Sequence, residues 1–218
     1  MLQAVIFDLD GVITDSARYH FEAWRDIASK LQISFDETYN EKLKGVSRLE
    51  SLNLILDNGP GRDYFSKDEK EALCTEKNEI YKELIKQITP DDLLPGIGNL
   101  LTECKKAGLK IGLASVSKNA PFIVERLQVA DYFDHIADAA KITRSKPFPD
   151  IFSDCVESFG LLPENCVGVE DAKVGIEAIH AAGMKAVGVG SPDQMADADL
   201  ILSGTSELNL QKLRSLAD

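Results

Sequence analysis

The sequence is poor in basic residues. It holds 24 lysines and arginines against 36 aspartates and glutamates, which gives a net charge of −12 over 218 residues. So acidic a chain is a poor match for nucleic acid or for an anionic membrane surface. Long apolar runs are also missing, and none approaches the length that would cross a bilayer. We therefore expect neither nucleic acid nor a membrane as a partner, and an anionic substrate would have to be held by a local cluster of lysine and arginine.

Other absences narrow the class of protein further. The sequence contains neither a Walker loop nor a glycine-rich nucleotide fingerprint, so ATP is not implied. A charged leader with a cleavage site is missing as well, because Met1–Gln3 runs straight into a predicted strand. The cysteines lack the spacing of a metal site, and we expect reduced, buried thiols in a cytoplasmic enzyme. The cysteines are Cys74, Cys104, Cys155 and Cys166.

Residues 16–87 show only the patterns of helices. Apolar residues recur at three- and four-residue spacing over 17–32, and a second helix is predicted over about 36–44. Ser47 and Ser66 each precede a glutamate by three residues, which is the form of a capping box that opens a helix. The segment is therefore expected to form a small all-helical domain.

The rest of the chain alternates between strands and helices. Strands that alternate with helices form a parallel sheet that is covered on both faces. We therefore predict an α/β fold, with a Rossmann-like parallel core from residues 1–15 and 88–218 and a helical cap domain from residues 16–87. The first predicted strand begins at Val5, and the others lie over 109–114, 135–137, 166–169, 186–189 and 200–202. Helices are predicted near 96–107, 120–128, 149–159 and 172–182 and at the end of the chain.

Two carboxylates end the first predicted strand. Asp8 and Asp10 follow an apolar run and precede Gly11. Because side chains alternate along an extended chain, both leave it on the same side, at the carboxyl end where open α/β sheets bind ligands. Like charges this close repel and need a cation or a shared proton. The alternative is a solvated acidic turn at the end of an edge strand.

Polar residues also follow later predicted strands. Ser115 opens a Ser-Val-Ser-Lys-Asn segment at a helix start, which either binds a phosphate or only caps the helix. Lys146 precedes a stiff Pro-Phe-Pro segment that would fix its direction; the alternative is a solvated surface lysine. Glu170 and Asp171 end another buried strand, which would lie beside Asp8 and Asp10 in the sheet; the alternative is an acidic turn without a function. Together with Asp8 they offer the oxygen ligands that Mg²⁺ prefers.

These motifs carry a resemblance to a known superfamily. In order along the chain they are Asp8–Val12, Ser115, Lys146 and Glu170–Asp171, and they resemble the four motifs of the haloacid dehalogenase superfamily of phosphotransferases. Within it the chain looks most like the β-phosphoglucomutase family. That likeness lies in Asp8–His20, Lys44–Arg48, Ser115–Asn119 and Lys146–Pro147. Val116 and Ser16 depart from the alanine and threonine usual in the family, without loss of a functional group.

The resemblance implies a role for each core residue. Asp8 would be the nucleophile that becomes an aspartyl phosphate, and Asp10 the general acid and base. Lys146 and Ser115 would contact the transferring phosphoryl group. The ligands of Mg²⁺ would be Asp8, the main-chain carbonyl of Asp10, Glu170 and Asp171.

A mutase also needs a second phosphate site, because its substrate carries phosphate at both ends in turn. Arg48 is the main candidate, since an arginine fork matches phosphate; the alternative is a solvated helix-surface arginine. His20 and Lys77 resemble residues that position Asp10 when the cap closes about hinges near residues 14–16 and 87–90; the alternative for His20 is a histidine that only packs within the helices. The implied substrate-binding residues are His20, Lys44, Gly45, Val46, Ser47, Arg48, Ser51, Lys77, Val116, Ser117, Lys118 and Asn119.

One function and two alternatives follow from this resemblance. The main expectation is a monomeric, Mg²⁺-dependent enzyme that interconverts β-glucose 1-phosphate and glucose 6-phosphate through a 1,6-bisphosphate. The first alternative is a sugar-phosphate phosphatase, which shares all four core motifs and differs only in the cap. The second is a non-catalytic binding protein on the same fold, which the intact pair of Asp8 and Asp10 argues against.

Overall fold

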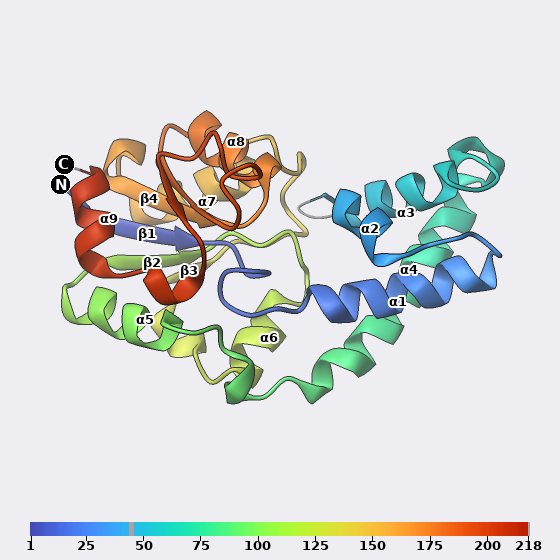
Figure 1. The fold of residues 1–218 in the computed structure, drawn as a ribbon, viewed down its shortest axis with the longest axis horizontal. Coiled ribbons are helices and arrows are strands. Elements are labelled where there is room, and N and C mark those ends of the chain that lie inside the picture. The colour runs from blue at the N-terminus through green and yellow to red at the C-terminus, as the bar shows by residue number, and fades with distance from the viewer. Residues whose placement is uncertain (44–45, 218) are drawn as a thin grey trace. The chain divides into compact units, whose positions relative to one another are not determined.

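The computed structural model describes residues 1–43 and 46–217 of the chain (Figure 1). The chain divides into two compact units, one formed by Met1–Asp15 with Ile88–Asp218 and the other by Ser16–Gln87. Every helix within the described ranges is too short or too polar to cross a membrane. Lys44 and Gly45, which the resemblance implies as substrate-binding residues, lie outside the described residues.

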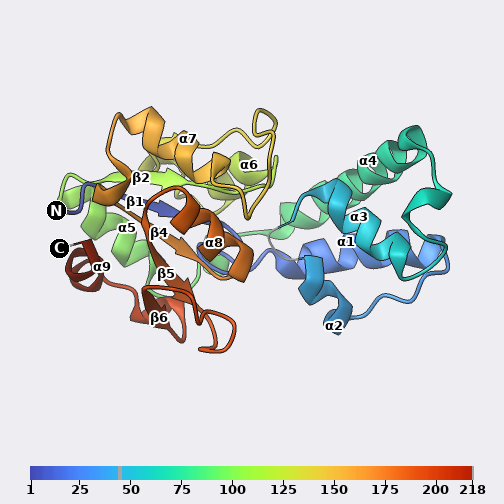
Figure 2. The ribbon, with the colours of Figure 1, turned by 90° about the horizontal axis from the view of Figure 1, so that it is seen from above.

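The first unit is built on a parallel sheet of six strands, in the order β3-β2-β1-β4-β5-β6. Short runs of valine, isoleucine and leucine form these strands because their branched side chains pack well on both faces of a covered sheet. Their bounds are β1 Ala4–Phe7, β2 Lys110–Leu113, β3 His135–Ile136, β4 Cys166–Glu170, β5 Lys185–Val189 and β6 Leu200–Leu202. Figure 2 shows β1, β4 and β5 side by side. The predicted α/β fold class is confirmed.

Helices cover both faces of this sheet. In Figure 1, α7 and α8 lie on one side of the strands and α5 and α6 lie on the other, while α9 contacts both α5 and β4. The helices are α5 Ile97–Lys106, α6 Ala120–Arg126, α7 Asp150–Phe159, α8 Lys173–Ala181 and α9 Leu210–Ala217, with 3₁₀ turns at Pro90–Asp92, Ala130–Tyr132, Pro163–Asn165 and Thr205–Glu207.

The core of the first unit follows from the alternation of side chains along its strands. Ala4 and Ile6 of β1 pack in one cluster with Phe152 of α7 and Ile179 of α8. Because successive side chains in a strand point to opposite faces, Val5 and Phe7 both face the other layer of helices, and all four β1 residues are fully buried. The first strand is thus fixed on both faces, which makes its carboxyl end a rigid place for a functional group.

The second unit contains only helices among its described residues. They are α1 Ala17–Lys30, α2 Glu37–Asn40, α3 Arg48–Asp57 and α4 Lys67–Leu84, with 3₁₀ turns at Glu41–Leu43, Arg62–Tyr64 and Ile85–Gln87. The helix predicted over about 36–44 corresponds to α2 and the 3₁₀ turn that follows it without a break, and its predicted last residue, Lys44, lies outside the described residues. None of the four residues of α2 is fully buried, but Tyr39 packs against the core of this unit and its hydroxyl donates to Leu54 O at 2.5 Å.

The four cysteines are free thiols. Cys104, Cys155 and Cys166 are buried as predicted, but Cys74 on α4 is only half-buried. Burial raises the pKa of Cys104 to about 12 and that of Cys166 to about 11. These thiols are therefore protonated at neutral pH and poor nucleophiles, which agrees with a packing role.

Candidate active site

The carboxyl ends of the central strands meet at β1. Its last residue, Phe7, pairs with the last residue of β2 and the penultimate residue of β4. Asp8, Ser115 and Glu170 therefore lie at one edge of the sheet. The strand order reverses here, because β2 lies on one side of β1 and β4 on the other. Open α/β sheets bind their ligands at such a point.

A buried ion cluster lies at this edge. Lys146 Nζ donates to Asp8 Oδ1 at 2.6 Å and to Glu170 Oε2 at 2.7 Å, and all three residues are buried. Burial alone would lower the pKa of Lys146, but the charges of Asp8 and Glu170 outweigh it and raise that pKa. The amine therefore stays cationic, and in surroundings that exclude water its charge acts strongly on Asp8.

Three carboxylates converge beside this lysine. Asp8, Glu170 and Asp171 can each place one oxygen within 4.8 Å of the others. Burial and then the charge of Asp8 raise the pKa of Glu170, against the opposing effect of Lys146. So much negative charge in one place favours a bound cation, and oxygen donors suit a hard divalent metal. The donor set thus fits the predicted metal site.

Two glycines leave the space that these carboxylates occupy. A Cβ atom at Gly175 would lie 2.0 Å from Glu170 Cδ, and one at Gly11 would lie 2.2 Å from Asp171 Oδ2. Gly11 also has a φ of +72°, a conformation that glycine adopts without the cost of a side chain. Glycine is needed at both positions because a side chain there would overlap the neighbouring carboxylate.

Asp10 lies in the turn that follows β1. The turn is closed by hydrogen bonds from Gly11 N to Thr14 O and from Ile13 N to Leu9 O, each at 2.8 Å. Asp10 is half-buried, whereas Asp8 is buried. A carboxyl group that solvent and ligand can reach suits proton transfer. Its predicted roles as acid, base and main-chain metal ligand stay predictions.

The segment after β2 forms a chain of local hydrogen bonds. Ser115 Oγ accepts from Ser117 N at 3.2 Å, and Ser117 Oγ accepts from Asn119 N at 3.3 Å. Ser115 is buried, Ser117 and Asn119 are half-buried, and Lys118 is exposed. Val116 is half-buried and packs on the core cluster, so its side chain serves packing. The serine hydroxyls and the lysine remain candidates for a phosphate group.

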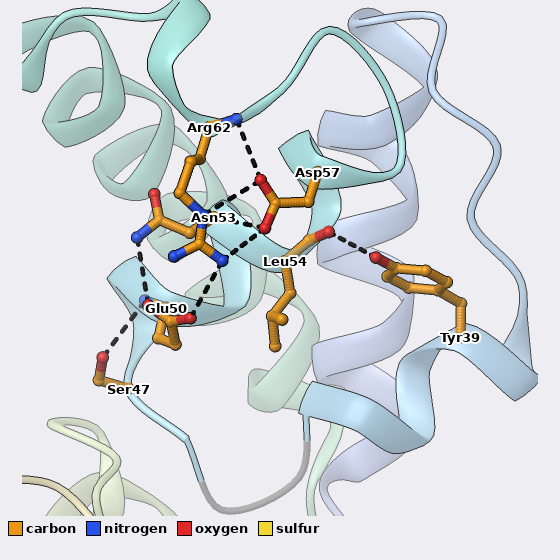
Figure 3. A network of polar contacts seen from close by, with 7 residues as sticks. All are labelled: Tyr39, Ser47, Glu50, Asn53, Leu54, Asp57 and Arg62. Carbon is orange, nitrogen blue, oxygen red and sulfur yellow. Dashed lines mark hydrogen bonds and ion pairs between the residues drawn. The ribbon is translucent and has the colours of Figure 1, made fainter.

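Arg48 is the first residue of α3 in the second unit. Ser47 caps this helix by accepting from Glu50 N at 3.3 Å, as its capping-box pattern predicts. The Glu50 carboxylate contacts Asn53 and lies 3.6 Å from Arg62, which also forms a fork on Asp57 (Figure 3). One arginine thus connects the first and last turns of α3, so the helix end that carries Arg48 is well held.

Arg48 is not a fully solvated surface residue. It is half-buried, and its Nη2 donates to Asn78 Oδ1 on α4 at 2.8 Å. Burial lowers the pKa of Arg48 without threatening its charge. Val46 and Ser47 beside it are half-buried, and Ser51, one turn further along α3, is buried.

His20 and Lys77 form a close pair in the second unit. Lys77 is only 2% exposed, and its Nζ donates to His20 Nδ1 at 2.7 Å. The ammonium also lies 4.5 Å from the ring centre of Tyr81, whose ring is 4.0 Å from that of His20. Burial, followed by the charges of Lys77 and Arg48, holds the pKa of His20 well below its usual range. His20 is therefore neutral, with its proton on Nε2.

Sequence reasoning missed several residues around these groups. Asn78 and Tyr81 were not named, although Lys77 and Tyr81 are four residues apart and so share a helix face, which was an available signal. Gly11 was named as the residue after Asp10, but only the fold shows that it lies beside Asp171 and that Gly175 lies beside Glu170. The partner of Arg48 could not be predicted for the same reason.

Comparison with known proteins places the chain among relatives along most of its length. A family model described as haloacid dehalogenase-like hydrolase matches residues 2–183. The chain is 50% identical over 212 residues to β-phosphoglucomutase of Bacillus subtilis, with 97% of this chain and 94% of that protein covered. It is 30% identical to hexitol phosphatase B of Escherichia coli, with 96% of each chain covered.

A solved structure gives the same result for the fold. The crystal structure of a β-phosphoglucomutase from Clostridium difficile has a TM-score of 0.97 and is 46% identical, covering 100% of this chain and 97% of that one. The resemblance read from the sequence motifs is confirmed, the family implies an enzyme with a metal cofactor, and the acidic cluster fits such a metal. The chain belongs to the haloacid dehalogenase-like hydrolases and, within them, is similar to the β-phosphoglucomutases.

Proposed function

We propose that this protein is a β-phosphoglucomutase, which converts β-glucose 1-phosphate into glucose 6-phosphate. The observation that carries the proposal is the 50% identity to the Bacillus subtilis β-phosphoglucomutase along 97% of the chain. The buried cluster of Asp8, Lys146 and Glu170 supports it, because such a site suits phosphoryl transfer to a carboxylate.

Asp8 is the proposed nucleophile. One of its carboxylate oxygens forms a bond to phosphorus, and the bond from phosphorus to the donor oxygen breaks. The contact at 2.6 Å with Lys146 keeps Asp8 ionised and offsets the charge of the arriving phosphoryl group. Mg²⁺, held by Asp8, Glu170 and Asp171, would add further positive charge at this point.

Asp10 is the proposed acid and base. It protonates the sugar oxygen that leaves phosphorus and, in the opposite direction, takes the proton from the hydroxyl that attacks the aspartyl phosphate. A complete cycle transfers a phosphoryl group from Asp8 to the substrate, which gives the 1,6-bisphosphate. This intermediate then reverses its orientation in the site and returns its other phosphoryl group to Asp8. The enzyme therefore needs a bisphosphate to load Asp8 at the start.

The phosphate that is not transferred needs its own site. We assign it to Arg48, with Ser117, Lys118 and Asn119 as further contacts, because a guanidinium binds phosphate through two parallel hydrogen bonds. His20 and Lys77 are assigned to the positioning of Asp10 when the helical unit closes about its two connections. Closure would exclude water, which otherwise competes for the aspartyl phosphate.

A sugar-phosphate phosphatase is the second candidate. The 30% identity to a hexitol phosphatase of Escherichia coli favours it, since that relative is covered as completely as the mutase. Both activities begin with phosphorylation of Asp8 and differ in what receives the phosphoryl group afterwards. The balance between a sugar hydroxyl and water as acceptor decides between them.

The test incubates the protein with β-glucose 1-phosphate, Mg²⁺ and a trace of glucose 1,6-bisphosphate, and measures glucose 6-phosphate and free phosphate together. We expect glucose 6-phosphate in large excess, a dependence on the bisphosphate, and no product with Asp8→Asn. Free phosphate as the main product would favour the phosphatase. Turnover by Asp8→Asn at the wild-type rate would exclude the covalent mechanism itself.

A further inference from the structure

Lys146 belongs to neither a helix nor a strand. It lies in the connection between β3 and α7, four residues before Asp150, the first residue of α7. Its side chain is long and loses considerable rotational freedom when it is held in one place. The position of its ammonium against Asp8 and Glu170 therefore depends on how firmly the loop is held.

A pair of side chains closes this loop. Arg144 Nη2 donates to Asp150 Oδ1 at 2.6 Å and Arg144 Nε donates to Asp150 Oδ2 at 3.1 Å, so the guanidinium grips both carboxylate oxygens. The same guanidinium carbon lies 4.8 Å from the ring centre of Phe148. Within the loop, Phe148 N donates to Ser145 O at 3.1 Å. Residues 144–150 thus form a closed ring that contains Lys146.

The anchor of this ring is rigid. Asp150 lies in the first turn of α7, where a carboxylate is favoured by the helix dipole, and its side chain is 18% exposed against 57% for Arg144. The next residues of α7, Ile151 and Phe152, are buried in the core, and the Phe152 ring lies 5.1 Å from Lys146 Nζ. The hydrogen bond from Arg144 is also the main reason why the pKa of Asp150 is lowered.

We propose that Arg144 is a positioning residue for Lys146. By holding the loop closed on Asp150, it fixes the ammonium against Asp8 and so sets the rate at which Asp8 is phosphorylated. The guanidinium does not itself touch the reacting atoms. The inference rests on the proposed function in one respect, namely that Asp8 accepts a phosphoryl group.

The chain offers a matched control for this ion pair. Lys110 at the start of β2 pairs with Asp134 at 3.0 Å, with side-chain exposures of 52% and 23% that are close to those of Arg144 and Asp150. It lies at the opposite end of the sheet from Asp8. Removing either cation costs an exposed ion pair of similar, small worth, so the two variants should unfold at similar urea concentrations. Only the Arg144 variant should lose the fixed position of the Lys146 ammonium against Asp8.

The experiment compares wild type, Arg144→Gln and Lys110→Gln in the phosphorylation of Asp8 by saturating acetyl phosphate with Mg²⁺. Arg144→Gln should lower the maximal rate constant roughly tenfold, because small misplacements of a catalytic group cost one to two orders of magnitude. Lys110→Gln should stay near wild type. Arg144→Lys keeps the charge but not the fork and should recover only part of the loss. Equal rates for Arg144→Gln and Lys110→Gln would overturn the inference.

Asp150→Asn provides a second test of the same contact. It should reduce the rate as Arg144→Gln does. The double variant Arg144→Gln with Asp150→Asn should be no slower than the slower single variant, because both changes remove the same interaction. Losses that multiply would contradict the clamp. Amide hydrogen exchange of residues 143–148 should accelerate in Arg144→Gln and not in Lys110→Gln. This measurement needs no turnover, so it decides whether Arg144 holds the loop even if wild type forms no phosphoenzyme, in which case the proposed function alone would fail.

Discussion

Gly175 shows how strongly a single atom can act at the residue scale. It lies in the first turn of α8, where alanine would ordinarily favour the helix by about 1 kcal/mol. The added Cβ would, however, come within 2.1 Å of Glu170 Oε2, and Glu170 is only 1% exposed and cannot swing into solvent. Gly175→Ala should therefore displace the carboxylate from Lys146 and from the proposed metal site. We expect weaker Mg²⁺ binding, measured by calorimetry, and at least a tenfold slower phosphorylation of Asp8.

Gly204→Ala is the control for this change. Gly204 lies in the same unit, and a Cβ there meets no atom within 4 Å at a φ of −170°. It should bind Mg²⁺ and accept a phosphoryl group as wild type does. Unchanged Mg²⁺ affinity in Gly175→Ala would mean that Glu170 is not a metal ligand, since its carboxylate cannot keep its place beside that methyl group.

At the scale of elements, one carboxylate joins three parts of the first unit. Asp199, just before β6, accepts from His180 at the end of α8 at 2.8 Å, from Lys185 at the start of β5 at 2.7 Å, and from Ala186 N at 2.8 Å. Burial would raise the pKa of Asp199, but these hydrogen bonds lower it to about 2. The lowered pKa means that the ionised form stabilises the fold.

Asp199→Asn should therefore destabilise the protein at pH 7, by only about 1 kcal/mol because solvent around this exposed residue weakens its contacts. A depressed carboxylate pKa contributes stability that is present above the unfolded-state pKa, near 4, and is lost as the pH falls toward the folded-state value. Urea unfolding of wild type and variant should thus give curves that converge between about pH 4 and pH 2. Asp197→Asn is the control, because its ion pair with Lys173 at 3.7 Å is exposed on both sides and contributes little. A constant difference between Asp199→Asn and wild type from pH 7 to pH 2 would contradict the assignment.

The elements themselves were largely predictable from the sequence. The strands that flank β1 were visible as short apolar runs, because a sheet covered on both faces needs apolar side chains on both. The helix predicted over about 36–44 is present, although its second half is a 3₁₀ turn, which the sequence pattern does not distinguish from an α-helix. Ser66 forms the complete predicted capping box with Glu69, whereas the Glu50 carboxylate is drawn toward Arg62, a partner that no local pattern reveals.

At the scale of the whole molecule, prediction of the site depended on topology. Asp8, Ser115 and Glu170 follow three predicted strands, and parallel strands place their carboxyl ends at one edge, so their proximity could be inferred. The contact between Arg48 and Asn78, and the burial of Lys77, depend on how helices pack against each other, which spacing alone does not determine. The cytoplasmic location and the monomeric state stay predictions.

The proposed function assigns a different task to each unit of the chain, and Arg48 provides the means to test that assignment. If Arg48 binds the phosphate that is not transferred, Arg48→Ala should weaken hexose phosphate binding by about 1.5–3 kcal/mol, the worth of a hydrogen bond to a charged group. Acetyl phosphate carries one phosphate only, so it should phosphorylate Asp8 nearly as well in the variant. The measurement compares kcat/KM for β-glucose 1-phosphate with that for acetyl phosphate, in wild type and variant.

Two further variants show whether the effect belongs to the guanidinium. Arg25→Ala removes an exposed arginine from α1 in the same unit and should change neither value. Asn78→Ala removes the acceptor that lies 2.8 Å from Arg48 and orients it, and it should reproduce part of the loss seen in Arg48→Ala, with the hexose phosphate alone.

Arg48→Ala should also change the ratio of products. Because less binding energy would be available to exclude water in this variant, free phosphate should rise relative to glucose 6-phosphate. Equal losses with both donors would instead mean that Arg48 stabilises the helical unit or contacts the transferring phosphate. The second phosphate would then need another site.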